Sequence, residues 1–144
     1  MKLKIKRMGE NAILPQYMTD GAAAMDMFAH LEAPVTLVPH TPTMIPLGVA
    51  VAIPEGYVGL IFGRSGMGAK FGVCPSNAVG VIDSDYRGEL KANLINHTDK
   101  ETVIEPGQRV AQLVVVPCLR METEECDELP ATKRGEGGYG STGK

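Results

Sequence analysis

The stretch Gly80-Val-Ile-Asp83-Ser-Asp85-Tyr86-Arg87-Gly88-Glu89 runs from an apolar strand into a polar turn. Its Val-Ile pair is typical of a buried strand, and the polar residues that follow indicate the reversal of a hairpin. Asp83 is therefore expected where the chain leaves the core, three residues before an aromatic ring. A carboxylate held in this way suits general-base chemistry on a small molecule, although an isolated aspartate in such a turn is more often an ordinary surface residue.

Short apolar segments separated by turn residues continue on both sides of this stretch. The 17 glycines and 10 prolines are spread along the chain, and many prolines fall at the ends of the apolar segments, where a missing N–H does least damage. We expect strands near residues 3–8, 35–38, 43–45, 49–53, 58–62, 90–95, 102–104 and 110–116, and one short helical turn at 65–70. This pattern predicts an all-β protein, either an antiparallel β-barrel or a jelly roll.

Composition narrows the class of protein. The chain has 144 residues, a size typical of one domain, and a net charge of -3, which argues against a general nucleic-acid or membrane-surface binder. No apolar run approaches the ~20 residues of a membrane helix. The three cysteines form no C-x-x-C pair, which favours reduced thiols in the cytoplasm, and the histidines show no zinc-ligand spacing. The sequon Asn96-His-Thr98 is interpreted as a coincidence.

Two further segments carry residues suited to an anionic ligand. In Gly63-Arg64-Ser65-Gly66, the glycines let a ligand approach the backbone closely, Arg64 supplies a guanidinium and Ser65 a hydroxyl. An exposed glycine-rich loop with no ligand would have the same composition. The tail from Arg134 to Lys144 contains five glycines, two hydroxyls and the Tyr139 ring. Such a tail is expected to be mobile, and it could close over a flat anion or have no role.

Three more residues are candidates whose surroundings the sequence leaves open. Asp26 is a lone carboxylate in a run of small residues, where a simple turn is the plainer interpretation. Arg109 is expected to be a structural ion-pair partner. Gln112, on the same predicted strand, could direct an amide towards a ligand.

Taken in order, five segments resemble the motifs of the homotrimeric dUTP pyrophosphatase (dUTPase) family. The resemblance spans nearly the whole chain, and its third and fifth segments are highly specific. The segments are Gly21-Ala-Ala-Ala-Met-Asp26-Met, Arg64-Ser65-Gly66, Asn77-Ala-Val-Gly80-Val81-Ile82-Asp83-Ser84-Asp85-Tyr86-Arg87-Gly88, Gly107-Gln-Arg-Val-Ala-Gln112-Leu and Arg134-Gly-Glu-Gly-Gly138-Tyr139-Gly140-Ser141-Thr142-Gly143.

Some positions depart from the family pattern. Ala24 and Met27 stand where Gly and Leu are usual, and Tyr139 stands where Phe is most frequent. Gln108 replaces the usual Asp or Glu and so removes a carboxylate that can pair with an arginine. A looser docking of the tail would follow from that change.

The resemblance implies a distorted jelly roll over residues 1–130, with a flexible glycine-rich lid at 131–144. It implies Mg²⁺-dependent hydrolysis of dUTP to dUMP and pyrophosphate, which limits uracil in DNA and supplies dUMP. Asp83 would be the general base, and Asp26 would reach Mg²⁺ indirectly, through metal-bound water. The residues implied to bind substrate are Arg64, Ser65, Gly66, Asn77, Gly80, Val81, Ile82, Asp83, Tyr86, Lys91, Gln112, Arg134, Gly138, Tyr139, Gly140, Ser141 and Thr142.

The same resemblance implies a cytoplasmic homotrimer whose sites are shared between subunits. Three alternatives remain. A dCTP deaminase has this fold, but it uses a glutamate where this chain has Asn93, which cannot shuttle protons. A catalytically inactive nucleotide sensor and a purely structural jelly roll are the other two, and both are disfavoured by the complete set of motifs.

Overall fold

The computed structural model describes residues 1–138 as eleven short strands and one helix. No helix within that range is long and apolar enough to cross a membrane. The elements are β1 (Lys4–Arg7), β2 (Met25–Phe28), β3 (Val35–Leu37), β4 (Thr43–Pro46), β5 (Val49–Ala52), β6 (Tyr57–Gly63), α1 (Ser65–Phe71), β7 (Val73–Pro75), β8 (Gly80–Ile82), β9 (Lys91–Asn96), β10 (Thr102–Ile104) and β11 (Arg109–Pro117).

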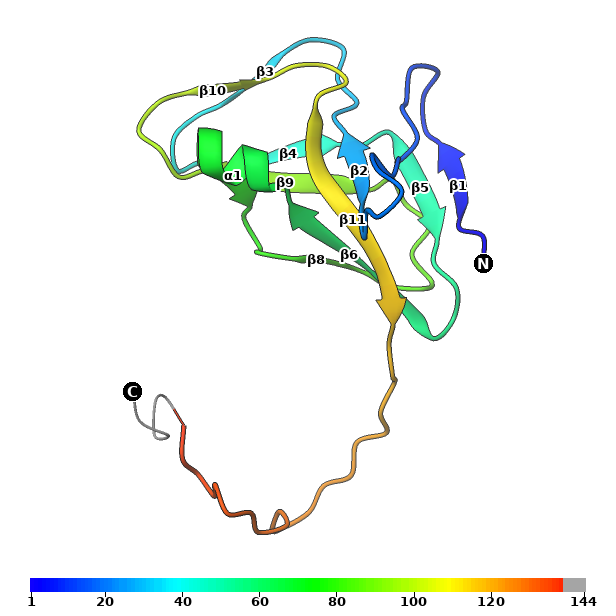
Figure 1. Cartoon of the computed structure of the whole chain (residues 1–144), viewed down its shortest axis with the longest axis vertical. Coiled ribbons are helices and arrows are strands. Elements are labelled where there is room, and N and C mark those ends of the chain that lie inside the picture. The colour runs from blue at the N-terminus through cyan, green and yellow to red at the C-terminus, as the bar shows by residue number, and fades with distance from the viewer. Residues whose placement is uncertain (139–144) are drawn as a thin grey trace.

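The strands form two larger sheets and two ribbons (Figure 1). One sheet has the order β2-β11-β6-β8, the other the order β4-β9-β7, and the ribbons are β1-β5 and β10-β3. Every ladder between these described strands is antiparallel. The prediction of an all-β fold of the jelly-roll type is confirmed.

The core lies between these sheets and is almost entirely aliphatic. Strand β9 shows how the sequence builds it, because its side chains alternate between buried and part-exposed positions along Lys91–Asn96. The side chains with under 2% exposure come from strands of both sheets, from the β10-β3 ribbon and from the residues next to β5 and β9, and the large ones are Met27, Leu37, Ile45, Leu47, Leu90, Leu94, Ile104 and Leu113. This packing fixes the ends of the strands, from which the candidate site residues project.

The expected hairpin after Ile82 is wrong. Strand β8 pairs with β6, whereas β9 pairs with β4 and β7, so the two strands on either side of the turn belong to different sheets. The reason is burial, since Ala92 and Leu94 on β9 fill the core of the second sheet and could not do so as partners of the exposed edge strand β8. The polar stretch 83–90 is a connection between layers.

Two strands were not expected, and both are short. Strand β2 contains Asp26, a charge in the middle of an otherwise apolar segment, and β7 is a Val-Cys-Pro triplet. Helix α1 confirms the predicted helical turn and extends it by one residue to Phe71. It ends at Gly72, whose φ of 62° suits glycine, and a Cβ there would lie 2.5 Å from the Thr98 methyl carbon.

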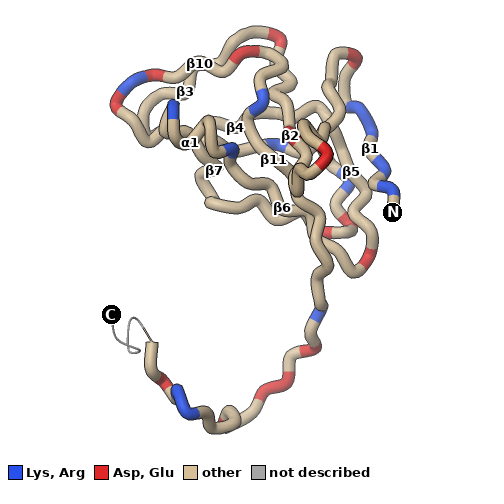
Figure 2. The backbone as a smooth tube through the Cα atoms, viewed as in Figure 1, with Lys and Arg blue, Asp and Glu red and all other residues tan. Residues whose placement is uncertain are grey.

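After β11 the chain leaves the body as an extended arm (Figure 1), tied at its start by the Cys118 N–H, which donates to the Gly56 carbonyl over 2.8 Å. An acidic stretch at 122–128 is followed by Lys133 and Arg134, as Figure 2 shows. Three apolar side chains of this arm, Leu119, Met121 and Leu129, are more than three-quarters exposed.

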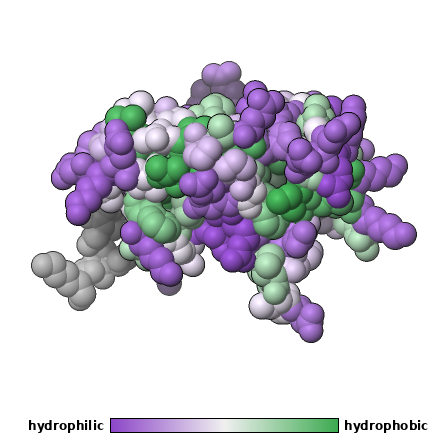
Figure 3. Space-filling model, turned by 90° about the horizontal axis from the view of Figure 1, so that it is seen from above, coloured by the Kyte–Doolittle hydropathy of each residue, from purple (hydrophilic) through white to green (hydrophobic). Residues whose placement is uncertain are grey.

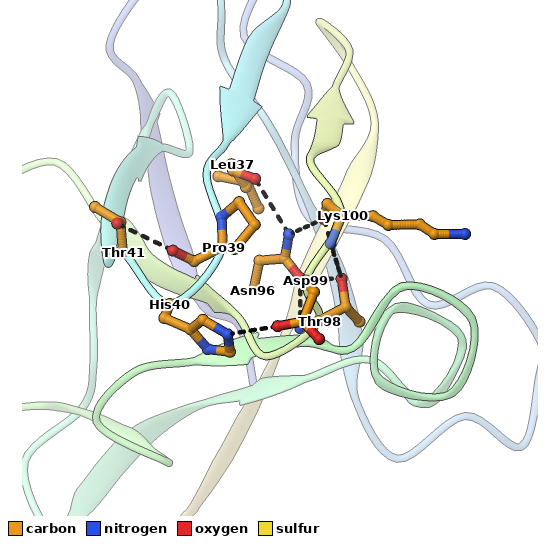
Figure 4. Close-up of polar contacts among 8 residues, drawn as sticks. All are labelled: Leu37, Pro39, His40, Thr41, Asn96, Thr98, Asp99 and Lys100. Atoms are coloured by element: carbon orange, nitrogen blue, oxygen red, sulfur yellow. Dashed lines mark hydrogen bonds and ion pairs between the residues drawn. The ribbon is translucent and has the colours of Figure 1, made fainter.

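The sequon asparagine is part of the framework of the fold. Asn96 is completely buried, and its amide donates to the carbonyls of Leu37 (3.2 Å) and Lys100 (2.7 Å). Its Oδ1 accepts from both the N–H and the hydroxyl of Thr98 (Figure 4). The side chain thus joins β3 to the turn between β9 and β10, as expected of a buried polar group that must be fully hydrogen-bonded.

Candidate active site

The connection between β8 and β9 presents an exposed carboxylate and an aromatic ring. Asp83 is exposed at the end of β8, and its carbonyl accepts from the Tyr86 N–H over 3.2 Å, which closes a tight turn. The Tyr86 hydroxyl donates to the Glu89 carbonyl over 3.1 Å, and its ring lies across Gly88. A Cβ on Gly88 would stand 2.6 Å from the ring carbon that bears the hydroxyl, so only glycine leaves room for this ring position.

Two side chains brace this connection. The Arg87 guanidinium donates to the carbonyls of Ser84 (2.7 Å) and Tyr86 (2.8 Å). Glu89 accepts the Gly48 N–H over 3.1 Å, which ties the connection to the turn between β4 and β5. The turn after Asp83 is therefore restrained from within by Arg87 and at its far end by Glu89.

The other residues expected at a nucleobase lie beside β8. Asn77 is exposed in the loop before this strand, and its amide nitrogen lies 4.0 Å from where a Cβ on Gly80 would be. Gly80 is paired with Ile61 of β6, and Ile82 with Gly59, while Val81 remains exposed. Lys91 is exposed at the start of β9. The backbone of β8 and the Asn77 amide thus share one edge of the first sheet.

A second group of polar residues surrounds Asp26. The Asp26 side chain is 10% exposed, and its carboxylate accepts from Arg64 Nε and from Arg109 Nη1, each over 3.1 Å. Arg64 also donates to the Arg109 carbonyl over 3.2 Å. The prediction that Arg109 is an ion-pair partner is confirmed. A buried carboxylate between two guanidiniums has its charge compensated and fixes where the guanidiniums lie.

A cavity of about 310 Å³ opens beside this cluster. Helix α1 contributes one face to it, because residues three and four apart on a helix are neighbours. The lining consists of Arg64, Gly66, Met67, Lys70, Phe71, Gln108 and Arg109. Sequence reasoning missed Lys70, although its spacing from Gly66 along the expected helical turn was a signal. Three cations against the Asp26 carboxylate leave this cavity suited to an anion.

The other candidate residues near the cavity are Ser65, Gly66, Gln108 and Gln112. Ser65 and Gly66 are exposed at the start of α1, and the Gln112 amide donates to the Gly63 carbonyl over 3.0 Å. Gln108 accepts the Glu105 N–H over 2.9 Å and lies 3.6 Å from the Met67 sulfur. Its amide thus joins the β10–β11 turn to α1.

The tail residues are only partly described. Arg134 is exposed, and its Nε donates to the Gly137 carbonyl over 2.7 Å within a local turn. Gly138 is half-buried. Four residues expected to bind substrate lie outside the described residues: Tyr139, Gly140, Ser141 and Thr142.

The two groups of polar residues do not meet within one chain. Asp26 on β2 is opposite Gln112 of β11, which in turn is opposite Phe62 of β6, and β8 follows as the next strand. Asp83 follows Ile82, the partner of Gly59. Three strand spacings of ~4.8 Å and four residues of ~3.3 Å along the strands place the backbones of Asp26 and Asp83 roughly 20 Å apart in a flat sheet. The two groups of polar residues therefore lie at opposite edges of the same sheet.

The carboxylates available to a metal ion are few. Among residues 1–138, no three His, Cys, Asp or Glu side chains are grouped to hold a metal. Asp26 uses both oxygens on guanidiniums, but each oxygen retains capacity for another hydrogen bond. This donor set fits a hydrated Mg²⁺ carried by phosphate oxygens, since Mg²⁺ in proteins keeps several waters and takes few carboxylates.

An antiparallel β-fold with an exposed carboxylate at one edge of a sheet and an arginine-lined cavity at the other fits a hydrolase of anionic substrates. Comparison with known proteins identifies the family. Residues 10–143 match the sequence model of the dUTPase family, and the chain belongs to that family. The resemblance noted from the motifs is confirmed.

Relatives and solved structures agree with this assignment. The chain is 47% identical over 143 residues to the deoxyuridine 5'-triphosphate nucleotidohydrolase of Hydrogenobaculum sp. (strain Y04AAS1), covering 99% of each chain. It is 46% identical to that of Syntrophotalea carbinolica, covering 98% of this chain and 96% of the relative. A Staphylococcus bacteriophage 80alpha dUTPase mutant with dUpNHpp superposes with a TM-score of 0.86 at 30% identity, covering 99% of each chain. The dUTPase of S. aureus phage phi11, described with a structural Mg(II) ion, gives 0.80 at 30% identity, covering 89% of this chain and 98% of that one.

Proposed function

We propose that this protein hydrolyses dUTP to dUMP and pyrophosphate. The observation that carries the proposal is the braced connection after β8, which holds Asp83 exposed three residues before the Tyr86 ring. Membership of the dUTPase family and the names of the relatives support the same substrate.

In the reaction, Asp83 accepts a proton from a water molecule as the water oxygen attacks the α-phosphorus. A new P–O bond forms to that oxygen, and the bond from the α-phosphorus to the bridging oxygen breaks. The electron pair of that bond leaves with pyrophosphate, and the α-phosphate remains on dUMP. General-base catalysis contributes about 10²–10⁴ of the rate, with orientation and electrostatics supplying the rest.

Recognition of the base and the sugar falls to the β8 edge. The uracil edge binds Asn77 and the backbone from Gly80 to Ile82, with Lys91 nearby. The Tyr86 ring lies under the deoxyribose, where it leaves no space for a 2′-hydroxyl. This role is supported by the restraint on the ring, which is held by its hydroxyl and by contact with Gly88.

The triphosphate binds in the arginine-lined cavity. Arg64, Ser65, Gly66 and Gln112 contact the phosphates, and Asp26 orients Arg64. Asp26 would also help to hold Mg²⁺ indirectly, through the water that the ion carries. Mg²⁺, when bound by the triphosphate, neutralises part of its charge and shapes the phosphate chain. The Mg(II) ion of the phage phi11 dUTPase is described as structural, so what it supports is that a protein of this family binds Mg²⁺.

A homotrimer with shared sites completes the enzyme. The support is the separation of roughly 20 Å between Asp26 and Asp83, since a neighbouring copy could bring its own Asp83 to this chain's cavity. Apolar side chains also remain exposed on the body, such as Met44, Val103 and Phe71. The face shown in Figure 3 has apolar areas between hydrophilic ones, as an interface with another copy would need.

Residues 1–130 serve as the catalytic body, and residues 131–144 act as a lid. Arg134, Ser141 and Thr142 bind the terminal phosphate, Gly138 and Gly140 allow close backbone approach, and Tyr139 stacks on the base. The location is the cytoplasm, a proposal supported by the free thiols of Cys74, Cys118 and Cys126.

A pyrophosphate-release assay tests this proposal. The purified protein is incubated with Mg²⁺ and, separately, with dUTP, dCTP, dTTP, dATP, dGTP and UTP. Release from dUTP alone is expected, with no ammonia from dCTP. Ammonia release would favour the deaminase alternative, and binding of dUTP without turnover would favour a nucleotide sensor.

A further inference from the structure

Glu89 is bonded to a turn that lies outside the candidate site. Its carboxylate accepts the Gly48 N–H over 3.1 Å, although the two residues are 41 positions apart in the chain. The backbone of the next residue is tied to the same turn, because the Leu90 N–H donates to the Val49 carbonyl over 2.8 Å and the Leu90 carbonyl accepts from the Leu47 N–H over 3.0 Å. The end of the connection between β8 and β9 is thus joined to the turn between β4 and β5.

The turn that Glu89 contacts is itself closely packed. A Cβ on Gly48 would lie 2.6 Å from the Cγ atom of His30 and 2.9 Å from the Cβ atom of Ala12, so both side chains pack directly against the turn. The Gly48 carbonyl also accepts the Met8 N–H over 2.8 Å. Packing and a backbone hydrogen bond therefore hold in place the N–H to which the Glu89 carboxylate is bonded.

The main chain of Glu89 holds the Tyr86 ring. The Tyr86 hydroxyl donates to the Glu89 carbonyl over 3.1 Å. Tyr86 is 44% exposed, so a ligand can reach this ring. Because the Glu89 side chain is bonded to Gly48, it restrains its own backbone and, with it, the carbonyl that receives the hydroxyl. One residue thus links the position of the ring to a closely packed turn.

We infer that Glu89 is a positioning residue for sugar discrimination, in that its carboxylate fixes the carbonyl that holds the Tyr86 hydroxyl. This inference rests on the proposed function, in which the Tyr86 ring leaves no space for a 2′-hydroxyl, and it adds a residue that touches no substrate. Without the bond to Gly48, the end of the connection would be free to shift, and the ring would shift with it. Space for a ribose would then open, because small displacements of a positioning group change how well a site distinguishes its substrates.

The test measures the ratio of kcat/KM for dUTP to kcat/KM for UTP in three variants of Glu89. Glu89→Ala removes the carboxylate, and Glu89→Asp keeps the charge but is one methylene too short to reach the Gly48 N–H. Glu89→Gln removes the charge but keeps an oxygen that can accept the same N–H. We expect the ratio to fall about three- to tenfold in the first two variants and less than about twofold in the third. Glu55→Ala, at an exposed glutamate in the turn between β5 and β6, is the matched control and should keep the wild-type ratio.

A double-mutant cycle with Tyr86→Phe separates positioning of the ring from general loosening. Phenylalanine lacks the hydroxyl, so in that background Glu89→Ala should change the ratio by less than about twofold. A purely structural role would lower kcat/KM for both nucleotides together, so an unchanged ratio in Glu89→Ala and Glu89→Asp would overturn the inference. An equal fall in Glu89→Gln, or the same fall in the Tyr86→Phe background, would also overturn it. Calorimetry with dUpNHpp and UpNHpp repeats the comparison as Kd, so a wild type that binds without turnover would count against the proposed function and leave this test intact.

Discussion

The Asp26→Asn substitution probes the buried carboxylate between Arg64 and Arg109. Asparagine keeps the volume of the side chain but removes its charge. Its single oxygen can still accept from one guanidinium, while its NH₂ group faces the other. We expect the folded state to lose stability because two charge-assisted hydrogen bonds of 3.1 Å are weakened or broken.

The size of the loss follows from how exposed each partner is. A hydrogen bond to a charged group contributes about 1.5–3 kcal/mol when protected from water. The Arg64 side chain is only 23% exposed, so its bond to Asp26 should contribute close to that range. The Arg109 side chain is 42% exposed, so its ion pair with Asp26 resembles a surface salt bridge, which contributes below ~1 kcal/mol. A total of about 2–3 kcal/mol is therefore expected, which for a chain of this size lowers Tm by roughly 5–10 °C.

Thermal unfolding is measured in EDTA at equal protein concentrations, so that neither metal binding nor assembly alters the comparison. Asp20→Asn, the same change at an exposed aspartate, is the matched control and should stay within about 0.5 kcal/mol of the wild type. The reasoning is refuted if Asp26→Asn melts within a degree of the wild type, because the ion pairs would then contribute nothing to the fold.

The other predictions concern the reaction. Asp83→Asn should reduce kcat by about 10²–10⁴ while Kd for dUpNHpp stays near the wild-type value, and near-normal turnover would exclude Asp83 as the base. Removal of residues 134–144 should lower dUTP hydrolysis roughly 10²-fold with Tm unchanged, because the described part of that segment bonds only locally; normal hydrolysis would contradict the lid. Gly88→Ala should displace the Tyr86 ring and lower the preference for dUTP over UTP about tenfold, as measured by the ratio of kcat/KM values, and an unchanged ratio would remove this ring from sugar discrimination.

Local sequence patterns predicted the strands but could not predict their partners. The segments near Ile45, Val51 and Leu113 are apolar enough to be recognised as strands in isolation, and Gly72 ends a helix that was also expected. The pairing after Ile82 depends on which layer has space for β9, and that is decided by residues far away in the chain. A hairpin was therefore the natural but incorrect prediction.

The candidate site shows the same limit. Asp26 made its segment look like a turn, because a charge in a strand interior is costly unless it is paired. Its partners are 38 and 83 residues away, outside any local window. The positive φ of Ala78, the residue after Asn77, could not be predicted from the sequence, because alanine has no preference for that conformation. Motif resemblance predicted roles for Asp83 and Arg64, but it could not predict the roughly 20 Å between the two groups of polar residues.

The hydrogen-bond network of Asn96 bears on the choice of an expression host. A secretory pathway would read Asn96-His-Thr98 as an acceptor for a glycan, yet both amide hydrogens and both lone pairs of this side chain are already used inside the fold. Sugar could be attached only before the chain folds, and a modified chain could not then close the corner between β9 and β10. Production of this protein by secretion would therefore set carbohydrate transfer in direct competition with folding.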